Sequence, residues 1–374
     1  MEALVFDPQS LSLKYHKYYP IPEISNDDEV IVRVDHTGVC GTDLHIIQGD
    51  FPVRNDRPFP LGHEFSGYIH AVGKNSTFKL GQRVAIDPNS GCQLCDCCRS
   101  GKYQHCLTAG LNSYIGIFKD GGWAKYCKVL QQQVYALPDG ITNKQACFAE
   151  PLSCVAHSFN RAGPLKVGEK ILIIGAGIIG NLFASALYYQ GHRNVTVSEK
   201  IEKRLDIFRR MSTGFRLINP DILEQEKMLY DVIIDCTGGN THESLDPPEP
   251  RKKCYVRLEP TILHGVLPQV ILFRGVREPG SQGLRTPVDL DRLMSSINLY
   301  QIFDKELTII GVKTNSFSFP TAIEWIKVMG ERYLEYHKLG VKTYWLSEYE
   351  TALADLKTGR VAKIIFKTAS LPLM

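Results

Sequence analysis

A glycine-rich turn between a strand and a helix constrains the fold of this chain more than any other feature. The apolar run 171–174 is typical of a buried strand, and a G-x-G-x-x-G pattern follows it and opens a helical stretch. Glu199 ends the next β-type run, 24 residues after the first glycine. Such glycines let a pyrophosphate approach a helix N-terminus, while the acid binds the adenosine ribose. The predicted dinucleotide site comprises Gly175, Gly177, Ile178, Ile179, Gly180, Glu199 and Arg204.

The acid at this turn favours NAD over NADP. The Glu199 carboxylate would repel a 2′-phosphate on the ribose. Lys200 and Arg204 follow it closely, and their positive charges keep NADP as an alternative.

The pattern of strands and helices changes along the chain. Up to about residue 150, short β-type runs such as EVIVRVD and QRVAID are broken by Gly, Pro and Asn, which indicates an antiparallel domain. From residue 170 strands alternate with helices, as in a doubly wound parallel sheet. The length of 374 residues suits about two domains. We predict an α/β protein with a β-rich domain over 1–150 and a parallel-sheet domain over 151–313.

Four cysteines form a C-x2-C-x2-C-x7-C pattern that predicts a metal site. Four thiolates on short loops suit tetrahedral zinc and leave no open coordination position, so we expect a structural ion. An iron–sulfur cluster is the less favoured alternative because no other feature supports redox chemistry. Cys97 is either a spare thiol or a ligand in a register shifted by one. The predicted ligands are Cys92, Cys95, Cys98 and Cys106.

A second candidate metal set lies nearer the N-terminus. Cys40 in GVCGTDLH and His63-Glu64 in LGHEFSG lie at glycine-flanked bends. A thiolate, an imidazole and a carboxylate make a plausible zinc set, and three protein ligands leave one position for a substrate. Glu150 is either a competing third ligand or a partner of the zinc-bound water, and Asp43 is expected to orient His63.

Two neighbours of Cys40 are candidates for proton transfer. Thr42 offers a hydroxyl two residues away, and His45 carries an imidazole that titrates near neutral pH. We predict that Thr42, His45 and Glu150 act as catalytic residues.

The segment 241–297 does not fit a regular alternation. Seventy residues separate Asp235 from Lys305, where about 40 would hold the expected elements. Proline, glycine and charge dominate 246–253 and 277–287, whereas Gln269–Phe273 (QVILF) still indicates a strand. Either these stretches are surface loops or they remodel the cofactor pocket.

Charge and composition exclude several partners. The 43 basic and 40 acidic residues give a net charge of +3, too balanced for a nucleic-acid surface. The apolar stretch 171–189 contains three glycines and Asn181 and suits a buried strand and helix better than a membrane span. The N-terminus shows no signal or transit pattern, so we expect an intracellular, cytoplasmic protein that binds a small molecule.

With these features assembled, the chain resembles the zinc-dependent medium-chain dehydrogenase/reductase family, in particular its polyol branch, which includes sorbitol, altritol, butanediol and threonine dehydrogenase-like proteins. The resemblance spans nearly the whole chain. It rests on GVCGTDLH, LGHEFSG, GCQLCDCCRSGKYQHC, IGIFKDGGWAKYC, AEPLSC, GAGIIG, DVIIDCTGG and IFDKELTIIGV, in that order.

The resemblance implies a GroES-like catalytic domain completed by the C-terminal tail 314–374, a Rossmann domain and two zinc ions per chain. The catalytic zinc falls on Cys40, His63 and Glu64, with Glu150 binding directly or through water, and the structural zinc on the four clustered cysteines. Thr42 takes the place of the residue that receives the alcohol proton, and His45 that of the relay histidine. The family implies NAD-dependent oxidation of a polyol to a ketone and assembly as a homodimer or homotetramer.

Two other functions remain as alternatives. In the first alternative, the substrate is an amino-alcohol such as L-threonine or another small alcohol. In the second, the irregular segment 241–297 disrupts the cofactor pocket and leaves a zinc-stabilised protein with impaired catalysis.

Overall fold

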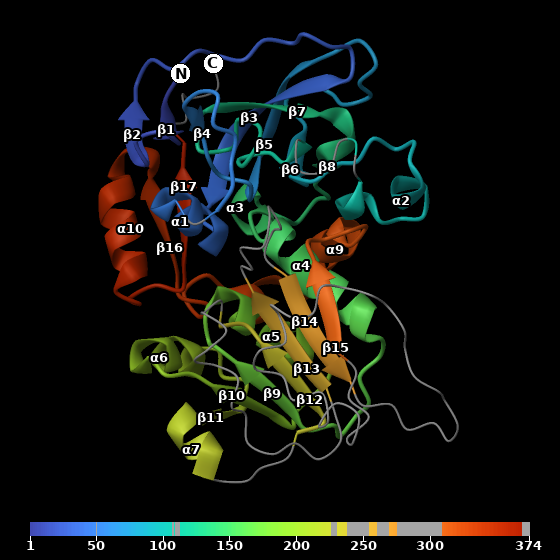
Figure 1. Ribbon diagram of the computed structural model, residues 1–374, viewed down its shortest axis with the longest axis vertical. Helices are drawn as coiled ribbons and strands as arrows, with labels where there is room; N and C mark the ends of the chain where they lie inside the picture. Colours follow the sequence, from blue (N-terminus) through green and yellow to red (C-terminus); the bar gives the residue numbers. More distant parts are fainter. Residues whose placement is uncertain are drawn as a thin grey trace. The chain divides into compact units, whose positions relative to one another are not determined.

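The computed structural model describes residues 1–49, 51–106, 108, 113–225, 230–237, 254–259, 269–274 and 309–368. They form two compact units, the first drawn from 1–157 and 314–374 and the second from 158–261 and 268–313 (Figure 1). The domain boundaries suggested by the sequence, at 150 and 313, stay predictions.

The first unit is built on two β-sheets. A three-stranded antiparallel sheet has the order β2-β1-β4, and a larger sheet has the order β16-β17-β3-β5-β6-β8 with β7 paired to β3. The strands of the unit are β1 (Ala3–Asp7), β2 (Ser12–His16), β3 (Glu29–Gly38), β4 (Phe59–Pro60), β5 (Phe65–Val72), β6 (Arg83–Ile86), β7 (Tyr126–Leu130), β8 (Val134–Ala136), β16 (Val341–Trp345) and β17 (Lys363–Lys367). The described strands within residues 1–150 pair antiparallel, as predicted, whereas β16 pairs parallel with β17.

The last described strand shares a sheet with the N-terminal part of the chain. β17 pairs antiparallel with β3, with Ile365 opposite Gly38, and in Figure 1 the red β17 lies beside the blue β3. β17 brings Lys363 next to the segment that precedes Cys40, where its Nζ reaches the Val39 carbonyl oxygen.

Most helices in this unit are short, and the two longest begin at Ala149 and Phe319. The helices are α1 (Gly41–Gln48), α2 (Asp96–Arg99), α3 (Asn143–Ala146), α9 (Phe319–Leu334) and α10 (Tyr349–Lys357), while α4 (Ala149–Ala162) begins in this unit and ends in the second. Among the described residues this unit also contains the single-turn 3-10 helices η1 (Tyr103–His105), η3 (Gln131–Gln133) and η4 (Leu346–Glu348).

Two apolar clusters form the core of the first unit. One contains the fully buried rings of Phe6, Phe59, Trp123 and Phe366, and the other lies among β3, β5, β6 and β7. Trp123 stacks edge-on against Phe366 at 5.5 Å between ring centroids, which joins the middle of the chain to β17.

The second unit contains the predicted alternation of strands and helices. Its sheet has the order β11-β10-β9-β12-β13-β14-β15, and β9 pairs parallel with both β10 and β12. The elements are β9 (Ile171–Ile174), α5 (Ile178–Tyr189), β10 (Val195–Ser198), α6 (Glu202–Arg210), β11 (Arg216–Ile218), α7 (Pro220–Gln225), β12 (Val232–Asp235), β13 (Cys254–Glu259), β14 (Gln269–Arg274) and β15 (Ile309–Lys313). The predicted doubly wound sheet is confirmed.

The irregular segment supplies one strand that runs against the others. β14 covers the predicted strand QVILF and pairs antiparallel with β13 and β15. The rest of 241–297, apart from β13, lies outside the described residues.

Among the described residues, no helix is both long enough and apolar enough to cross a lipid bilayer.

Candidate metal and cofactor sites

Cys40, His63 and Glu64 meet in the first unit. Cys40 immediately precedes α1, and the other two lie just before β5. One ligand atom from each residue lies within 4.8 Å of the others. The structure thus brings together the three residues that the sequence predicted as one metal set.

Asp43 organises this group from the first turn of α1. It is fully buried, and its Oδ2 accepts a hydrogen bond from the Cys40 backbone N–H at 2.8 Å. Its Oδ1 lies 3.4 Å from His63 Nδ1. The carboxylate therefore stands where it can fix the orientation of the imidazole, as the sequence predicted.

The electrostatics of the group suit a cation. Burial alone would lower the pKa of His63, but the adjacent Asp43 and Cys40 charges raise it well above its usual value. A site that draws a proton to a buried imidazole also attracts a metal ion. The donor set of one thiolate, one imidazole and one carboxylate fits zinc.

Glu64 is held by a lysine that the sequence analysis missed. Lys363 on β17 is buried, and its Nζ forms an ion pair with Glu64 Oε2 and donates to the Val39 carbonyl oxygen at 3.1 Å. Since Oε2 is paired, Glu64 Oε1 is the oxygen left for a cation. In the sequence, the sign of a buried, paired lysine is the position of Lys363 inside the otherwise apolar run VAKIIF.

Glu150 lies outside the three-residue ligand group but interacts with it electrostatically. Burial raises the pKa of its carboxyl to about 7, with the Glu64 charge adding to the effect and His63 opposing it. One helical turn later on α4, Cys154 Sγ lies 3.8 Å from Glu150 Oε1. The two sequence-based roles for Glu150, as a direct ligand or through water, both stay predictions.

The two proposed proton-transfer residues lie on α1. Thr42 is buried, and its Oγ1 is 3.7 Å from Cys40 Sγ. His45 follows at the i+3 position, which places both residues on one face of the helix. The buried Nδ1 of His45 has no hydrogen-bond partner among the described residues.

The cysteine cluster has the spacing of a tetrahedral site. Ligand atoms of Cys92, Cys95, Cys98 and Cys106 all lie within 4.8 Å of one another. The Cys98 sulfur lies 3.5 Å from that of Cys95 and 4.0 Å from that of Cys92. With Zn–S bonds of about 2.3 Å, tetrahedral geometry places sulfurs about 3.8 Å apart, so the four residues fit a zinc ion.

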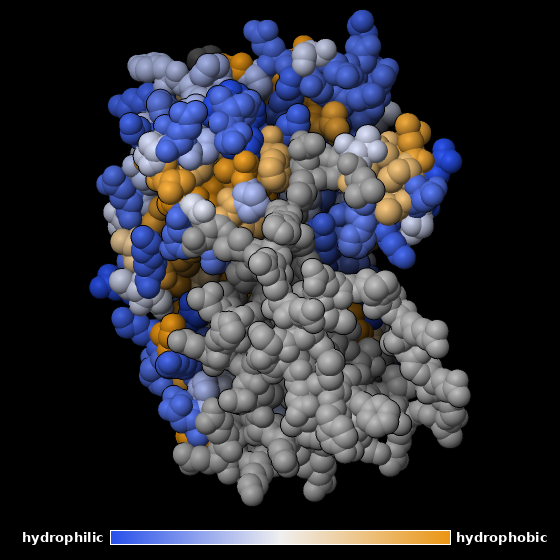
Figure 2. Space-filling view, in the orientation of Figure 1, coloured by the Kyte–Doolittle hydropathy of each residue, from blue (hydrophilic) through white to orange (hydrophobic). Residues whose placement is uncertain are grey.

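Backbone amides favour the thiolate of one cysteine in the cluster. The Cys95 N–H donates to Cys92 Sγ at 3.3 Å, and amide hydrogen bonds from Leu94 and Cys95 lower the pKa of Cys92. Cys97 lies on α2 but outside the group of four, which favours the unshifted register. Figure 2 shows apolar residues gathered on the lobe that carries α2, where Leu94 is 72% exposed.

In the second unit the glycine-rich turn has the conformation that the motif requires. Gly175 has a φ of +95°, a backbone conformation open to glycine, and a Cβ on Gly180 would lie 1.9 Å from the Gly175 carbonyl oxygen. A Cβ on Gly177 would meet nothing within 4 Å. Gly175 and Gly180 therefore serve the packing of the turn, while Gly177 keeps its outer surface open.

Glu199 binds the same turn from the end of β10. Its buried carboxylate accepts hydrogen bonds from the backbone N–H groups of Ala176 at 2.9 Å and Ile201 at 2.8 Å. Arg204 lies 3.6 Å away and partly neutralises it. Ile178 and Ile179, half-buried, begin α5 directly after the turn. All seven predicted cofactor residues thus surround one strand–turn–helix junction.

Comparisons with known proteins agree with these two units. The model of the alcohol dehydrogenase GroES-like domain matches residues 26–139, and that of shikimate / quinate 5-dehydrogenase matches residues 160–244. A short chain alcohol dehydrogenase from Escherichia coli CFT073, solved with NADH, has a TM-score of 0.76 and 24% identity, with 98% of this chain and 99% of that one covered. The fold is that of a two-domain dehydrogenase.

Sequence relatives define the family. Sorbitol dehydrogenase of Bombyx mori is 31% identical over 287 residues, which are 75% of this chain and 81% of that protein. D-arabinitol dehydrogenase 1 of Uromyces fabae is 28% identical, with 93% of this chain and 92% of that protein covered. The chain belongs to the zinc-dependent medium-chain dehydrogenase/reductase family.

Proposed function

We propose that the protein oxidises a secondary hydroxyl of a polyol to a ketone with NAD as the hydride acceptor. The observation that carries this proposal is the convergence of Cys40, His63 and Glu64 beside the Thr42 hydroxyl. Relatives that act on sorbitol and D-arabinitol support a polyol as the substrate class.

In this proposal Cys40, His63 and Glu64 hold a zinc ion, and Asp43 fixes the imidazole. A bound zinc ion supplies Lewis-acid polarisation of the substrate hydroxyl. The Thr42 hydroxyl accepts the proton released from the substrate oxygen, and His45 passes it toward solvent. A bound NAD would accept a hydride from the carbon that carries this hydroxyl. The alcohol would thereby lose two electrons and two hydrogens in all.

The seven residues around the glycine-rich turn bind the dinucleotide. The Gly177 surface admits the pyrophosphate at the start of α5, and Glu199 accepts hydrogen bonds from the ribose. The same carboxylate disfavours a 2′-phosphate, which supports NAD over NADP.

The four clustered cysteines hold a second, structural zinc ion in this proposal. Their thiolates complete its coordination, so the ion fixes the loop and takes no part in catalysis. A cluster of cysteines without disulfides is typical of a reducing compartment, which supports a cytoplasmic location. Assembly as a homodimer or homotetramer rests on the family resemblance and is tested by light scattering.

A substrate panel tests the activity. Zinc-loaded protein is incubated with NAD and D-sorbitol, xylitol, D-arabinitol or L-threonine, and NADH and the ketone are measured. Polyol-dependent NADH formation that is lost in His63→Ala, with the fold retained by circular dichroism, supports the proposal. Turnover of L-threonine alone would replace the polyol by an amino-alcohol, and full activity of His63→Ala would exclude the zinc mechanism.

A further inference from the structure

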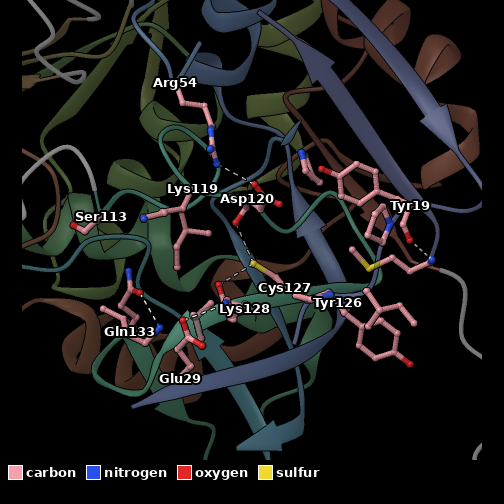
Figure 3. A pocket seen from close by; sticks show the side chains of 18 of the residues that line it. Tyr19, Glu29, Arg54, Ser113, Lys119, Asp120, Tyr126, Cys127, Lys128 and Gln133 are labelled. Atoms are coloured by element: carbon pink, nitrogen blue, oxygen red, sulfur yellow. Dashed lines mark hydrogen bonds and ion pairs between the residues drawn. The ribbon is translucent and has the colours of Figure 1, made fainter. Parts of the chain in front are cut away.

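The first unit contains a pocket that the proposed function does not use. Its volume is about 760 Å³, within the range of small-molecule sites. It is lined by residues from the N-terminal segment 19–22, the loop before β4, the loop 113–123 and β7 (Figure 3). None of the proposed metal or cofactor ligands is among them.

The charges on the pocket wall favour an anion. Four basic residues line it, Arg54, Arg57, Lys119 and Lys128, against the two acidic residues Glu29 and Asp120. Both acids are already paired, Glu29 with Lys128 at 3.1 Å and Asp120 with Arg57 at 2.6 Å.

One cation in the wall, the exposed side chain of Lys119, has no acidic partner among the described residues. Arg54 binds Asp56 through two hydrogen bonds of 2.7 Å and also contacts Asp120. Lys119 forms no ion pair with any residue that the structure describes. In Figure 3 its ammonium points away from Asp120 and toward Ser113. Even with the Asp56 charge counted, Lys119 remains uncompensated.

The remaining wall is apolar and aromatic. Pro20, Ile21 and Pro22 line one side together with Tyr19 and Tyr126. The Tyr19 hydroxyl accepts a hydrogen bond from Arg57 at 3.0 Å, which fixes both side chains. Proline and tyrosine surfaces beside a free ammonium suit a small molecule with a flat apolar body and one anionic group.

The loop 113–123, which carries Lys119, is hydrogen-bonded to the segment before His63. The backbone N–H groups of Gly121, Gly122 and Trp123 donate at 2.8 Å to the carbonyl oxygens of residues 60, 62 and 61. Gly116 packs so closely on Gly62 that a Cβ there would lie 2.5 Å from the Gly62 oxygen. A ligand bound at Lys119 would therefore contact a loop that lies directly against the proposed metal-binding segment.

We propose that this pocket binds a small organic anion, a carboxylate or a phosphate ester with an aromatic or similarly flat apolar body, and that Lys119 is its anchor. The site is separate from the proposed alcohol and dinucleotide sites, and the loop 113–123 that carries Lys119 is hydrogen-bonded to the segment before His63.

The test uses zinc-loaded protein saturated with NAD, so that the glycine-rich turn is occupied. Benzoate and phenyl phosphate are titrated separately, with methyl benzoate as the uncharged control, and binding is followed by protein NMR and by hydrogen exchange. We expect saturable binding of at least one anion, none of methyl benzoate, and slower exchange in 114–123.

A matched pair of variants locates the site. Lys119→Gln should weaken anion binding about tenfold, the loss expected for one charge-assisted hydrogen bond. Lys74→Gln, which removes an ammonium with 87% exposure from outside the pocket, should leave it unchanged. The proposal fails if neither anion binds saturably, if methyl benzoate binds equally well, or if Lys119→Gln binds as tightly as wild type. Protection confined to 175–180 would also overturn it.

Discussion

Lys363 and Glu64 form a buried ion pair across 299 residues of sequence, with side chains 1% and 2% exposed. The pair joins β17 to the proposed metal-binding segment. The C-terminal part of the chain therefore helps to shape the candidate catalytic site.

Loss of the Lys363 ammonium should destabilise the protein strongly. In the zinc-free protein, Lys363→Met leaves the buried Glu64 carboxylate without its lysine partner, which costs about 3–5 kcal/mol. Urea unfolding measures the loss. In the double variant Lys363→Met/Glu64→Gln much of the stability should return, because no buried charge is left without a partner.

A surface pair provides the control for this experiment. Lys342 pairs with Asp355 at 3.0 Å but is 54% exposed, so Lys342→Met should change stability little. Equal effects of Lys342→Met and Lys363→Met would contradict the role assigned to the buried pair.

The two central cysteines of α2 should differ in zinc binding. Cys98→Ser removes one of four converging sulfurs, so the zinc content should fall from about two ions per chain to about one. Cys97→Ser removes a thiol outside the cluster and should keep both ions. Elemental analysis of the purified variants measures the zinc content. Zinc loss in Cys97→Ser but not in Cys98→Ser would mean that the ligand register is shifted by one.

Two glycines of the cofactor turn should respond differently to alanine. Gly177 has a φ of −72° and open space around its Cβ position, so Gly177→Ala should fold normally yet bind NAD at least tenfold more weakly. Gly180→Ala forces a Cβ against the Gly175 carbonyl and should lower the melting temperature. Thermal unfolding and NAD titration separate the two effects. Unchanged NAD affinity in Gly177→Ala would exclude pyrophosphate binding at this turn.

Asp87 should make stability depend on pH. Burial raises the pKa of this carboxyl, although Asn89, Tyr103 and Asn315 donate hydrogen bonds to it. A raised folded-state pKa favours the protonated form, so the contribution of Asp87 to stability is largest at low pH and is lost as pH rises through that pKa. The isosteric Asp87→Asn should therefore gain stability relative to wild type at a pH well above the raised pKa of Asp87, and the gain should shrink as the pH is lowered through that pKa.

Asp87→Ala serves as the contrast. It leaves buried donors without an acceptor, which costs about 1–3 kcal/mol for each unpaired group. Urea unfolding across the pH range measures both variants. A stability difference between Asp87→Asn and wild type that does not vary with pH would rule out titration of this carboxyl as the cause.

Local patterns allowed much of the fold and of the candidate sites to be predicted. The turn 175–180 and the cysteine cluster depend on short spacings, and Cys40 and His63 occur in glycine-flanked motifs. Contacts between distant segments could not be predicted in the same way. Nothing near Lys363 identifies Glu64 as its partner, and Asn315 reaches Asp87 across 228 residues. The direction of β14 was equally hidden, because an apolar run has the same pattern in a parallel or an antiparallel pairing.

The most direct test of the central claim is an NAD titration of purified protein, followed by intrinsic fluorescence, with the zinc content determined on the same sample. We predict two zinc ions per chain and saturable NAD binding. One zinc ion and no NAD binding would mean that the cysteine cluster alone is functional, and it would contradict the assignment as an NAD-dependent dehydrogenase.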